Sequence, residues 1–294
     1  LSSLLRPIHR PEMSPRLKAA LPLENDSLLL RAVSVKGAGR EQDSFPFSVP
    51  VVRALKQLEL TAPVTFFVGA NGSGKSTLLE GIAAAAGLPT VGSASVDADP
   101  TLSEQRKLGK ALKLVWNRRS HRGFFLRAED FFGFAKQVTQ LRRDLLSRLD
   151  EISQEFADRS DYARGLAEGP ARASLGELER SYGADPDGAS HGERFLRLLR
   201  SRVVPGGLYL LDEPEAALSP QSQLGLLALF ARMVEEGSQL IVASHSPILM
   251  ALPGAVLYSF DDAPPERTAY SQLEHVNLTR DFLNDPERFL RHLI

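Results

Sequence analysis

The chain has 294 residues, of which 43% are hydrophobic, and its formal net charge is −1 at pH 7. It is long enough for one large or two small domains, and the balanced charge argues against a surface coated in cations while leaving a local basic patch open. Cysteine is absent, which excludes disulfides, thiolate metal sites and cysteine nucleophiles. No apolar run approaches the roughly 20 residues that span a bilayer, so we expect a cytoplasmic protein without direct membrane insertion.

The first part of the chain leads into a buried strand. Residues 1–27 hold four prolines and show no clean periodicity, which predicts an irregular arm. A strand is then expected at 28–35, an edge strand or loop at 45–50, and a helix at 51–58. The run Val64-Thr65-Phe66-Phe67-Val68 has the length and the β-branched and aromatic character of a buried strand.

A phosphate-binding loop follows that strand and opens a helix at 77–86. Gly69 and Gly74 bracket four residues and Lys75-Ser76 follows, so the G-x-x-x-x-G-K-[ST] pattern is complete. Glycines allow successive backbone N–H groups to point into one concavity around a polyphosphate. Lys75 would bridge the β- and γ-phosphates of ATP, and the Ser76 hydroxyl would ligate Mg²⁺. The expected nucleotide-binding residues are Gly69, Ala70, Asn71, Gly72, Ser73, Gly74, Lys75, Ser76 and Thr77.

The middle of the chain is expected to be mainly helical. Residues 89–103 have a loop-like pattern, and short strands are expected at 114–116 and 123–126. From Ala128 to about Ala163 the apolar residues recur at threes and fours, which predicts an amphipathic helix too short for a long coiled-coil arm. Residues 165–189 are rich in Gly, Ala and Pro and are interpreted as a mobile connection.

One local basic cluster, Trp116-Asn117-Arg118-Arg119-Ser120-His121-Arg122, stands next to an aromatic residue. Such a cluster can contact a nucleic-acid backbone or nucleotide phosphates. A solvated charged face explains the same residues, and both interpretations stay open.

The last third alternates helices and strands, which predicts a mostly parallel sheet with helices on its faces. The strand 208–211 ends in Asp212 and Glu213. Opposite a phosphate loop, Asp212 would hold Mg²⁺ and Glu213 would polarise the attacking water as general base. The remaining elements are expected at 190–202 (helix), 221–236 (helix), 240–243 (strand) and, for a short final helix, from 284–287.

Three further fragments, with these two motifs, resemble the ATP-binding-cassette class of P-loop ATPases. Ser190-His191-Gly192-Glu193 lies 22 residues before Asp212, in the place of the signature motif, although it is also a helix capping box. His245 lies 33 residues after Asp212, in the place of the switch histidine, although a polar residue commonly ends a strand. Ala217-Leu218-Ser219-Pro220 occupies the place of the D-loop.

The resemblance implies a composite site. His245 would contact the γ-phosphate, while Ser190 and Gly192 would contact the γ-phosphate of a nucleotide held by a second subunit. Each site would then need two copies, in a homodimer formed on ATP binding. The catalytic residues would be Glu213, His245 and Lys75, with ATP and Mg²⁺ as cofactors.

The chain departs from the transporter pattern at three places. These are the signature sequence, Glu215 after Asp-Glu-Pro, and Ser246 after the histidine. They look like the SMC/RecF-like and related stand-alone AAA-type ATPases, over about residues 28–260. The glutamine of the Q-loop is missing, and Glu129 stands in its place, where it could ligate Mg²⁺ or cap a helix. Phe45 and Phe47 are candidates for stacking on adenine, with core packing as the alternative.

These observations predict an α/β P-loop NTPase similar to ABC ATPases, with a mostly parallel sheet flanked by helices, an antiparallel β subdomain and an inserted helical lobe. The expected function is Mg²⁺-dependent ATP hydrolysis linked to DNA repair or maintenance, with DNA as a partner. The alternatives are the nucleotide-binding subunit of a transporter, or a defence or regulatory ATPase with a separate effector protein. The expected divisions are 1–27 (irregular arm), 28–104 (core, first part), 105–189 (helical lobe and connection) and 190–294 (core, second part).

Overall fold

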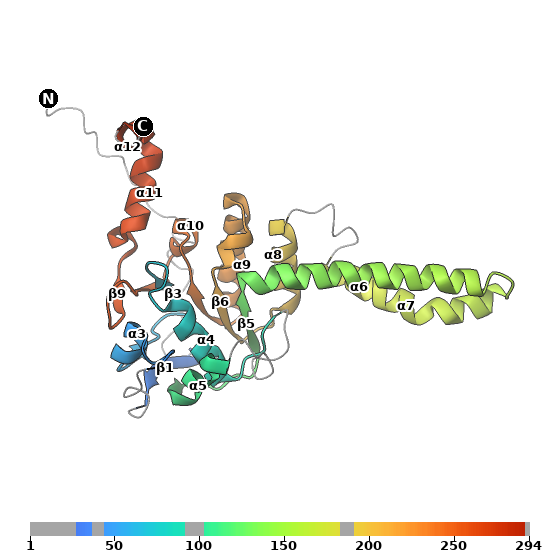
Figure 1. Cartoon of the computed structure of the whole chain (residues 1–294), viewed down its shortest axis with the longest axis horizontal. Helices are drawn as coiled ribbons and strands as arrows, with labels where there is room; N and C mark the ends of the chain where they lie inside the picture. Colours follow the sequence, from blue (N-terminus) through green and yellow to red (C-terminus); the bar gives the residue numbers. More distant parts are fainter. Residues whose placement is uncertain (1–27, 37–43, 92–102, 183–190, 292–294) are drawn as a thin grey trace.

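A computed structural model describes residues 28–36, 44–91, 103–182 and 191–291, and it contains two sheets (Figure 1). The larger sheet has six strands in the order β5-β6-β7-β3-β8-β9, and the smaller has the order β2-β1-β4. All neighbours in the larger sheet are parallel except β9, which pairs antiparallel with β8. The strands of the larger sheet are β3 (Val64–Val68), β5 (Gly123–Arg127), β6 (Leu208–Asp212), β7 (Gln239–Ala243), β8 (Val256–Ser259) and β9 (Glu266–Thr268).

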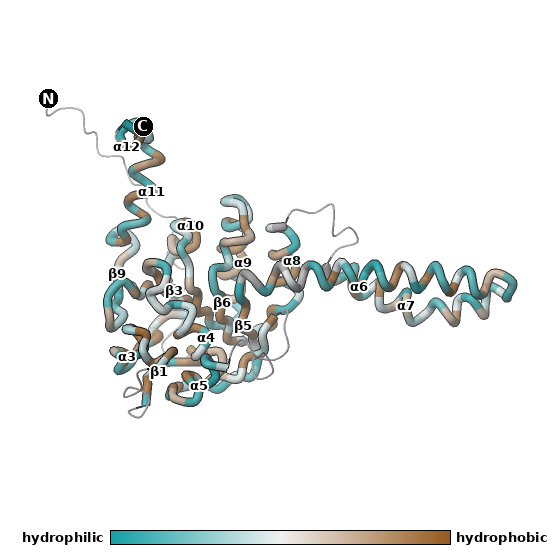
Figure 2. Tube along the Cα trace, in the orientation of Figure 1, coloured by the Kyte–Doolittle hydropathy of each residue, from teal (hydrophilic) through white to brown (hydrophobic). Residues whose placement is uncertain are grey.

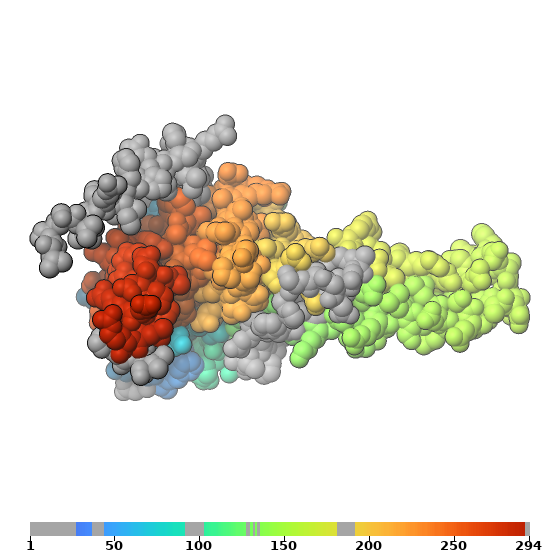
Figure 3. Space-filling view, turned by 90° about the horizontal axis from the view of Figure 1, so that it is seen from above, coloured from blue at the N-terminus to red at the C-terminus, as the bar shows by residue number. Residues whose placement is uncertain are grey.

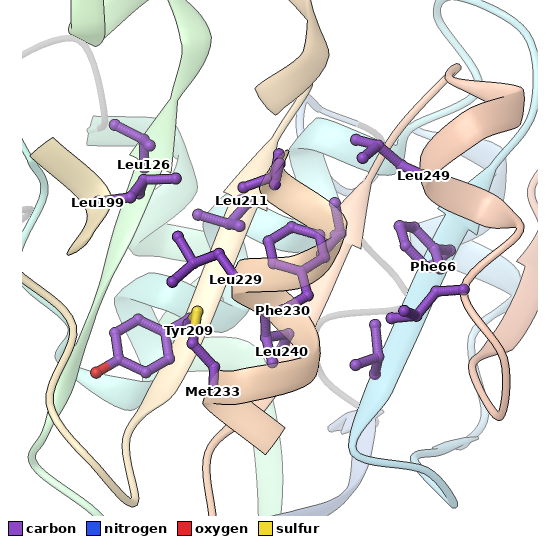
Figure 4. Close-up of a cluster of buried hydrophobic side chains, with 14 of the residues drawn as sticks. Phe66, Leu126, Leu199, Tyr209, Leu211, Leu229, Phe230, Met233, Leu240 and Leu249 are labelled. Carbon is purple, nitrogen blue, oxygen red and sulfur yellow. The ribbon is translucent and has the colours of Figure 1, made fainter. Parts of the chain in front are cut away.

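Helices cover both faces of the parallel sheet, so its central strands are buried and mostly apolar. Every residue of β3 and of β7 is buried, as expected for strands covered on both faces. Phe66 packs with Phe230 of α9 (Pro220–Glu235) on one face, and its neighbour Phe67 packs with Leu78 of α4 (Lys75–Ala86) on the other. Figure 4 shows the first of these two clusters, with side chains from four strands and from helices on that face.

The helices α4, α9 and α8 (His191–Arg202) fall where the sequence predicted them, with different ends, whereas α5 (Ser103–Ala111) and α10 (Pro247–Met250) were not predicted. The expected helix at 51–58 is shorter, because β2 begins at Leu58, and the residues expected as an edge strand or loop at 45–50 form a turn that leads into it. The core also contains that helix, α3 (Pro50–Ala54), and a 3-10 turn η3 (Pro214–Ala217). The expected arm at 1–27 and most of the expected loop at 89–103 lie outside the described residues.

A pair of antiparallel helices, α6 (Ala128–Glu155) and α7 (Asp161–Tyr182), projects from the core (Figures 1 and 3). The amphipathic helix predicted from Ala128 to about Ala163 is confirmed as far as Glu155, where it ends eight residues early. The prediction of a mobile connection at 165–189 was wrong as far as Tyr182, because α7 occupies that stretch, and 183–189 lie outside the described residues. The Ser160 hydroxyl accepts the Ala163 amide at 3.3 Å and caps a second helix. Alanine is the best helix former, so the Ala-rich run continues as helix, even through Pro170.

The two helices bury a shared apolar seam and leave polar residues outside. Val138 and Ile152 of α6 and Ala171 and Leu178 of α7 are buried. Figure 2 shows hydrophobic and hydrophilic residues alternating along both helices. At 1.5 Å per residue α6 is about 42 Å long. The inserted helical lobe is therefore confirmed, in the form of a hairpin.

The smaller sheet is the antiparallel subdomain predicted from the sequence, with strands β1 (Leu30–Val35), β2 (Leu58–Glu59) and β4 (Leu112–Trp116). The buried side chain of Gln239, at the start of β7, joins it to the larger sheet. Its Oε1 accepts the amides of Leu29 at 3.0 Å and Leu30 at 2.8 Å, and its Nε2 donates to the Leu30 carbonyl at 2.8 Å.

The C-terminal part holds a helix that the sequence patterns did not predict. After the 3-10 turn η4 (Tyr270–Gln272) come α11 (Glu274–Asn284) and α12 (Pro286–Leu290), which extend away from the sheets in Figure 1. The short final helix is confirmed, and Asp285 caps it by accepting the Arg288 amide at 3.2 Å. Among the described residues no helix is long and apolar enough to cross a membrane.

Candidate active site

The phosphate loop lies between β3 and α4, and its shape depends on glycine. Gly69, Gly72 and Gly74 all have positive φ, of 140°, 80° and 98°. A Cβ on Gly74 would also lie 2.7 Å from a methyl carbon of Val49. L-residues with side chains rarely adopt such φ values, so these positions need glycine for the backbone to turn into the start of α4.

The ammonium group of Lys75 sits inside this loop. Its Nζ donates to the carbonyls of Gly69 and Ala70, at 2.8 Å each, and the residue is almost fully buried. Burial lowers its pKa, while the nearby carboxylates, first those of Glu213 and Asp212, raise it. The loop is thus folded around a cation, as a site for phosphate requires.

Asp261, which the sequence patterns did not single out, ties the loop to the neighbouring strand. Its Oδ1 accepts the Ala70 amide at 2.8 Å, and its Oδ2 accepts the Ser259 hydroxyl at 3.0 Å. The signal that could have found it is position, because it follows β8, and parallel strands next to β3 end at the same edge.

Ser76 and Asp212 meet across the sheet edge, as the sequence predicted for a metal site. The Ser76 hydroxyl donates to Asp212 Oδ1 at 3.0 Å. The pKa of Asp212 is raised to about 7, first by burial and then by the charges of Glu80 and Glu213, against the Ser76 hydrogen bond and the charge of Lys75, which lower it. A buried carboxylate beside a hydroxyl, with a pKa raised by desolvation, fits a hard divalent cation such as Mg²⁺.

Glu213 lies at the mouth of the phosphate loop. It lines a pocket of about 360 Å³ together with Asn71, Gly72 and residues 74–77 of the loop and helix, and with Phe45 and Val49. Among the described residues it alone, apart from glycines, has positive φ, at 49°. Such backbone costs free energy and is typical of functional sites.

His245 follows β7 and faces Glu213. Its Nε2 lies 3.6 Å from Glu213 Oε1, and among the described residues this buried nitrogen has no hydrogen-bond partner. Burial lowers the pKa of His245, and the positive charge of Lys75 lowers it further. The imidazole is therefore neutral at pH 7 and can donate or accept one hydrogen bond.

Glu215 holds the backbone of that histidine, a role that we did not predict although its departure from the transporter pattern was noted. Its Oε1 accepts the backbone N–H of His245 at 2.5 Å and the Ser244 hydroxyl at 2.9 Å. Burial raises the pKa of Glu215, and these hydrogen bonds lower it.

A second hollow, of about 450 Å³, lies on the other side of the loop. Gly69, Ala70, His245 and Asp261 line it, and α11 contributes His275. The Nε2 of His275 is buried and has no hydrogen-bond partner among the described residues. No motif flagged His275, since only the fold brings α11 to this place.

Most other predicted site residues are not part of the phosphate-loop pocket, or lie outside the description. Gly192 is buried at the start of α8, where a Cβ would lie 2.5 Å from Ser222 Oγ, and it does not line the phosphate-loop pocket. Ser190 and the side chain of Glu129 lie outside what the structure describes. Phe47 is buried in the core, whereas Phe45 is 48% exposed and does line the phosphate-loop pocket.

Comparisons with known proteins agree with this geometry. A family model described as "AAA domain, putative AbiEii toxin, Type IV TA system" matches residues 110–251, and one described as "AAA domain" matches 47–98. The lipoprotein-releasing system ATP-binding protein LolD of Bordetella avium is 31% identical over 232 residues, which are 77% of this chain and 92% of LolD. The nickel import ATP-binding protein NikO of Rhodobacter capsulatus is 31% identical over 222 residues, 72% of this chain and 81% of NikO.

Longer proteins and solved structures also match. The macrolide export ATP-binding/permease protein MacB of Rhodopseudomonas palustris is 30% identical over 223 residues, and the match spans only 31% of MacB. A nucleotide-free ATP-binding cassette from an ABC transporter has 15% identity and a TM-score of 0.43, covering 88% of this chain and 96% of that one. The Smc head domain of Pyrococcus furiosus has 13% identity and a TM-score of 0.41, covering 88% and 100%. On the strength of the LolD and NikO matches, this chain belongs to the ATP-binding-cassette family of P-loop ATPases.

Proposed function

We propose that this protein is a Mg²⁺-dependent ATPase, and the observation that carries the proposal is the 3.0 Å hydrogen bond between Ser76 and Asp212. It brings the first hydroxyl of the phosphate-loop helix to the carboxyl end of β6, where these two oxygens would hold Mg²⁺. When bound, the ion would supply positive charge to the β- and γ-phosphates. The backbone N–H groups from Gly72 to Thr77 and the ammonium of Lys75 would hold the phosphates themselves.

Glu213 is our candidate for the general base. It borders the phosphate-loop pocket, so its carboxylate can take a proton from a water aligned with the γ-phosphate. His245, neutral at pH 7, would donate a hydrogen bond to a γ-phosphate oxygen. Its unpartnered Nε2, which faces the Glu213 carboxylate, supports that role.

The working unit is proposed to be a homodimer that closes on ATP. Gly192, and Ser190 just before it, would reach the γ-phosphate held by the other copy. The support for this is that Gly192, at the start of α8, does not line the phosphate-loop pocket of its own chain. Glu129 would complete the metal site from the start of α6.

For the biological role we propose the SMC/RecF-like branch, linked to DNA repair or maintenance. The supporting observation is the projecting hairpin of α6 and α7, inserted between β5 and α8. We divide the chain at 28–104, 105–189 and 190–294, with the hairpin in the middle unit. The LolD and NikO matches favour a transporter subunit instead, and the toxin–antitoxin family model favours a defence ATPase with a separate effector.

Two variants test the mechanism. Lys75→Ala should abolish binding of a fluorescent ATP analogue, because the loop loses its only buried cation among the described residues. Glu213→Gln should bind ATP at the wild-type level, hydrolyse it at least 100-fold more slowly and accumulate as a dimer. ATP binding by the first variant, or wild-type turnover by the second, would each remove the residue from its assigned role. Proteins that co-purify with the trapped dimer would separate the three biological roles.

A further inference from the structure

A groove at the far end of α4 carries four cations from separate parts of the chain. It has a volume of about 530 Å³ and is lined by Lys36 after β1, Arg106 and Lys110 of α5, and Arg119 after β4. Trp116 of β4 also lines it, and among the residues that the structure describes no carboxylate belongs to its lining. Since the whole chain has a net charge of −1, this is a local concentration of positive charge.

The structure divides the basic cluster that the sequence shows at 116–122. Arg122 donates to the Pro205 carbonyl at 3.3 Å and Ser120 to the Gly206 carbonyl at 3.1 Å, so this half faces the loop before β6. Trp116 and Arg119 instead face the groove, where residues distant in sequence join them. A local charge run thus becomes part of a site built by the fold.

The groove is separate from the nucleotide site. It adjoins Ala84 and Ala85 at the end of α4, whereas the phosphate loop precedes Lys75 at the beginning of that helix. At 1.5 Å per residue about 15 Å of helix lies between them. The anion that this groove attracts is therefore not the phosphate of the ATP in the loop of the same chain.

The C-terminal end of α5 accounts for only some of the cations in the groove. Lys36 Nζ donates to the Lys110 carbonyl at 2.8 Å, and cations are favourable at the C-terminal end of α5. Glu104, the one acidic residue of α5, pairs with Lys107 at 2.7 Å and does not line the groove. Arg106 and Arg119 add two positive charges to the same groove that the helix end does not require.

We propose that this groove binds a single strand of nucleic acid, with its phosphates on the four cations and a base against the half-buried Trp116. Grooves for single strands combine these two features, because cations follow the backbone and an aromatic ring stacks on a base of any sequence. An acidic peptide would use the cations but has no base to stack. This inference rests on the DNA-linked branch of the proposed function and gives it a surface.

Fluorescence anisotropy with a labelled 20-nucleotide single strand, in the full-length protein, tests the proposal. Each phosphate contact on a single strand contributes about −0.7 to the slope of log affinity against log salt. Four contacts predict a loss of about 50-fold between 50 and 200 mM salt. Lys110→Gln with Arg119→Gln should halve that slope, so that the same salt change costs about sevenfold.

Trp116→Leu should weaken binding about tenfold with little change of slope, since it removes stacking but no charge. The matched control is Lys136→Gln with Arg143→Gln, two exposed cations of α6, which removes the same charge and should leave binding unchanged. Urea denaturation of each variant shows whether it is folded. The proposal is overturned if the control variant weakens binding as much as the groove variant does. It is also overturned if polyglutamate displaces the labelled strand as well as an unlabelled strand does.

The outcomes separate this proposal from the ATPase. Lys110→Gln with Arg119→Gln should hydrolyse ATP at the wild-type rate without nucleic acid. A wild-type protein that hydrolyses ATP but does not bind the strand at 50 mM salt refutes the groove and leaves the ATPase intact. A protein that binds the strand through these cations but never hydrolyses ATP refutes the ATPase and leaves the groove intact.

Discussion

Glu215 Oε1 accepts the backbone N–H of His245, so a carboxylate two residues after the candidate base holds the backbone of the proposed switch histidine. The same oxygen accepts the Ser244 hydroxyl at 2.9 Å. The two strand ends that carry Glu213 and His245 are thereby joined through one side chain.

Replacement of Glu215 tests this connection. Glu215→Ala removes both hydrogen bonds, and we expect kcat to fall about tenfold while the affinity for ATP changes less than threefold, since the phosphate loop is untouched. Glu215→Gln keeps a carbonyl oxygen in place and should retain most of the activity. Steady-state kinetics measure both variants, and equal losses in the two would show that charge, rather than the hydrogen bonds, matters.

From the raised pKa of Asp212 we expect metal binding to depend on pH near neutrality. The Asp212 pKa of about 7 leaves the carboxyl largely protonated at pH 6, and a proton competes with a cation. From this pKa we expect the affinity for Mg²⁺-ADP to be about tenfold weaker at pH 6 than at pH 8. Calorimetry at both values measures it, with Asp212→Asn as control. A variant with the same pH dependence would show that another group titrates.

The same carboxyl gives a stability prediction of opposite sign. Because the pKa of Asp212 lies above the ordinary value of 3.8, the folded chain holds a proton that the unfolded chain has lost between these two pH values. The free energy of unfolding without ligand should therefore fall as the pH rises from about 4 to 7. Urea denaturation at three pH values checks this, and in Asp212→Asn this contribution should be absent.

Loss of the Gln239 side chain should lower the free energy of unfolding, because this side chain links the two sheets. Gln239→Leu leaves the amides of Leu29 and Leu30 and one carbonyl without their buried partner. We expect the free energy of unfolding to fall by about 2–4 kcal/mol, because each buried backbone group left unpaired costs about 1–3 kcal/mol. Urea denaturation measures it, and the exposed Gln57→Leu should change it by less than about 0.5 kcal/mol. Similar values for the two variants would contradict the link.

The ion pairs of Arg127 connect the base of the hairpin to the core, and their loss should lower the free energy of unfolding. Arg127 makes two hydrogen bonds to Asp130 in the first turn of α6, at 3.0 and 3.1 Å, and lies 3.5 Å from Glu80 of α4. Arg127→Met leaves two largely buried carboxylates without their cation, which should cost about 3 kcal/mol at pH 8. The cost should be smaller at pH 5, where Glu80, whose pKa burial already raises, can take up a proton. Thermal unfolding at both values tests this.

Local patterns predicted the parts of the site that belong to one strand or one turn. The phosphate loop, the buried strands and the carboxylates of Asp212 and Glu213 follow from spacing and apolar runs of a few residues. The meeting of Ser76 with Asp212 was also predictable, since parallel strands end at one edge.

Contacts between distant segments were not predictable in this way. Asp261 and Gln239 act on backbone groups about 190 and 210 residues away in sequence, and no periodicity records such pairs. The hairpin was missed for another reason. The glycines and prolines of 165–189 predict a connection, but packing along a shared apolar seam keeps this stretch helical as far as Tyr182.

The position of Arg127 connects the hairpin to α4, so a movement of α4 would also move the hairpin. The arm is about 42 Å long by its rise per residue, and its base is bound to the helix that begins at the phosphate loop. A lever of that length turns a rotation of about 10° at its fulcrum into a tip displacement of roughly 7 Å. A shift of α4 too small to alter the core would thus become a movement large enough for another molecule to sense.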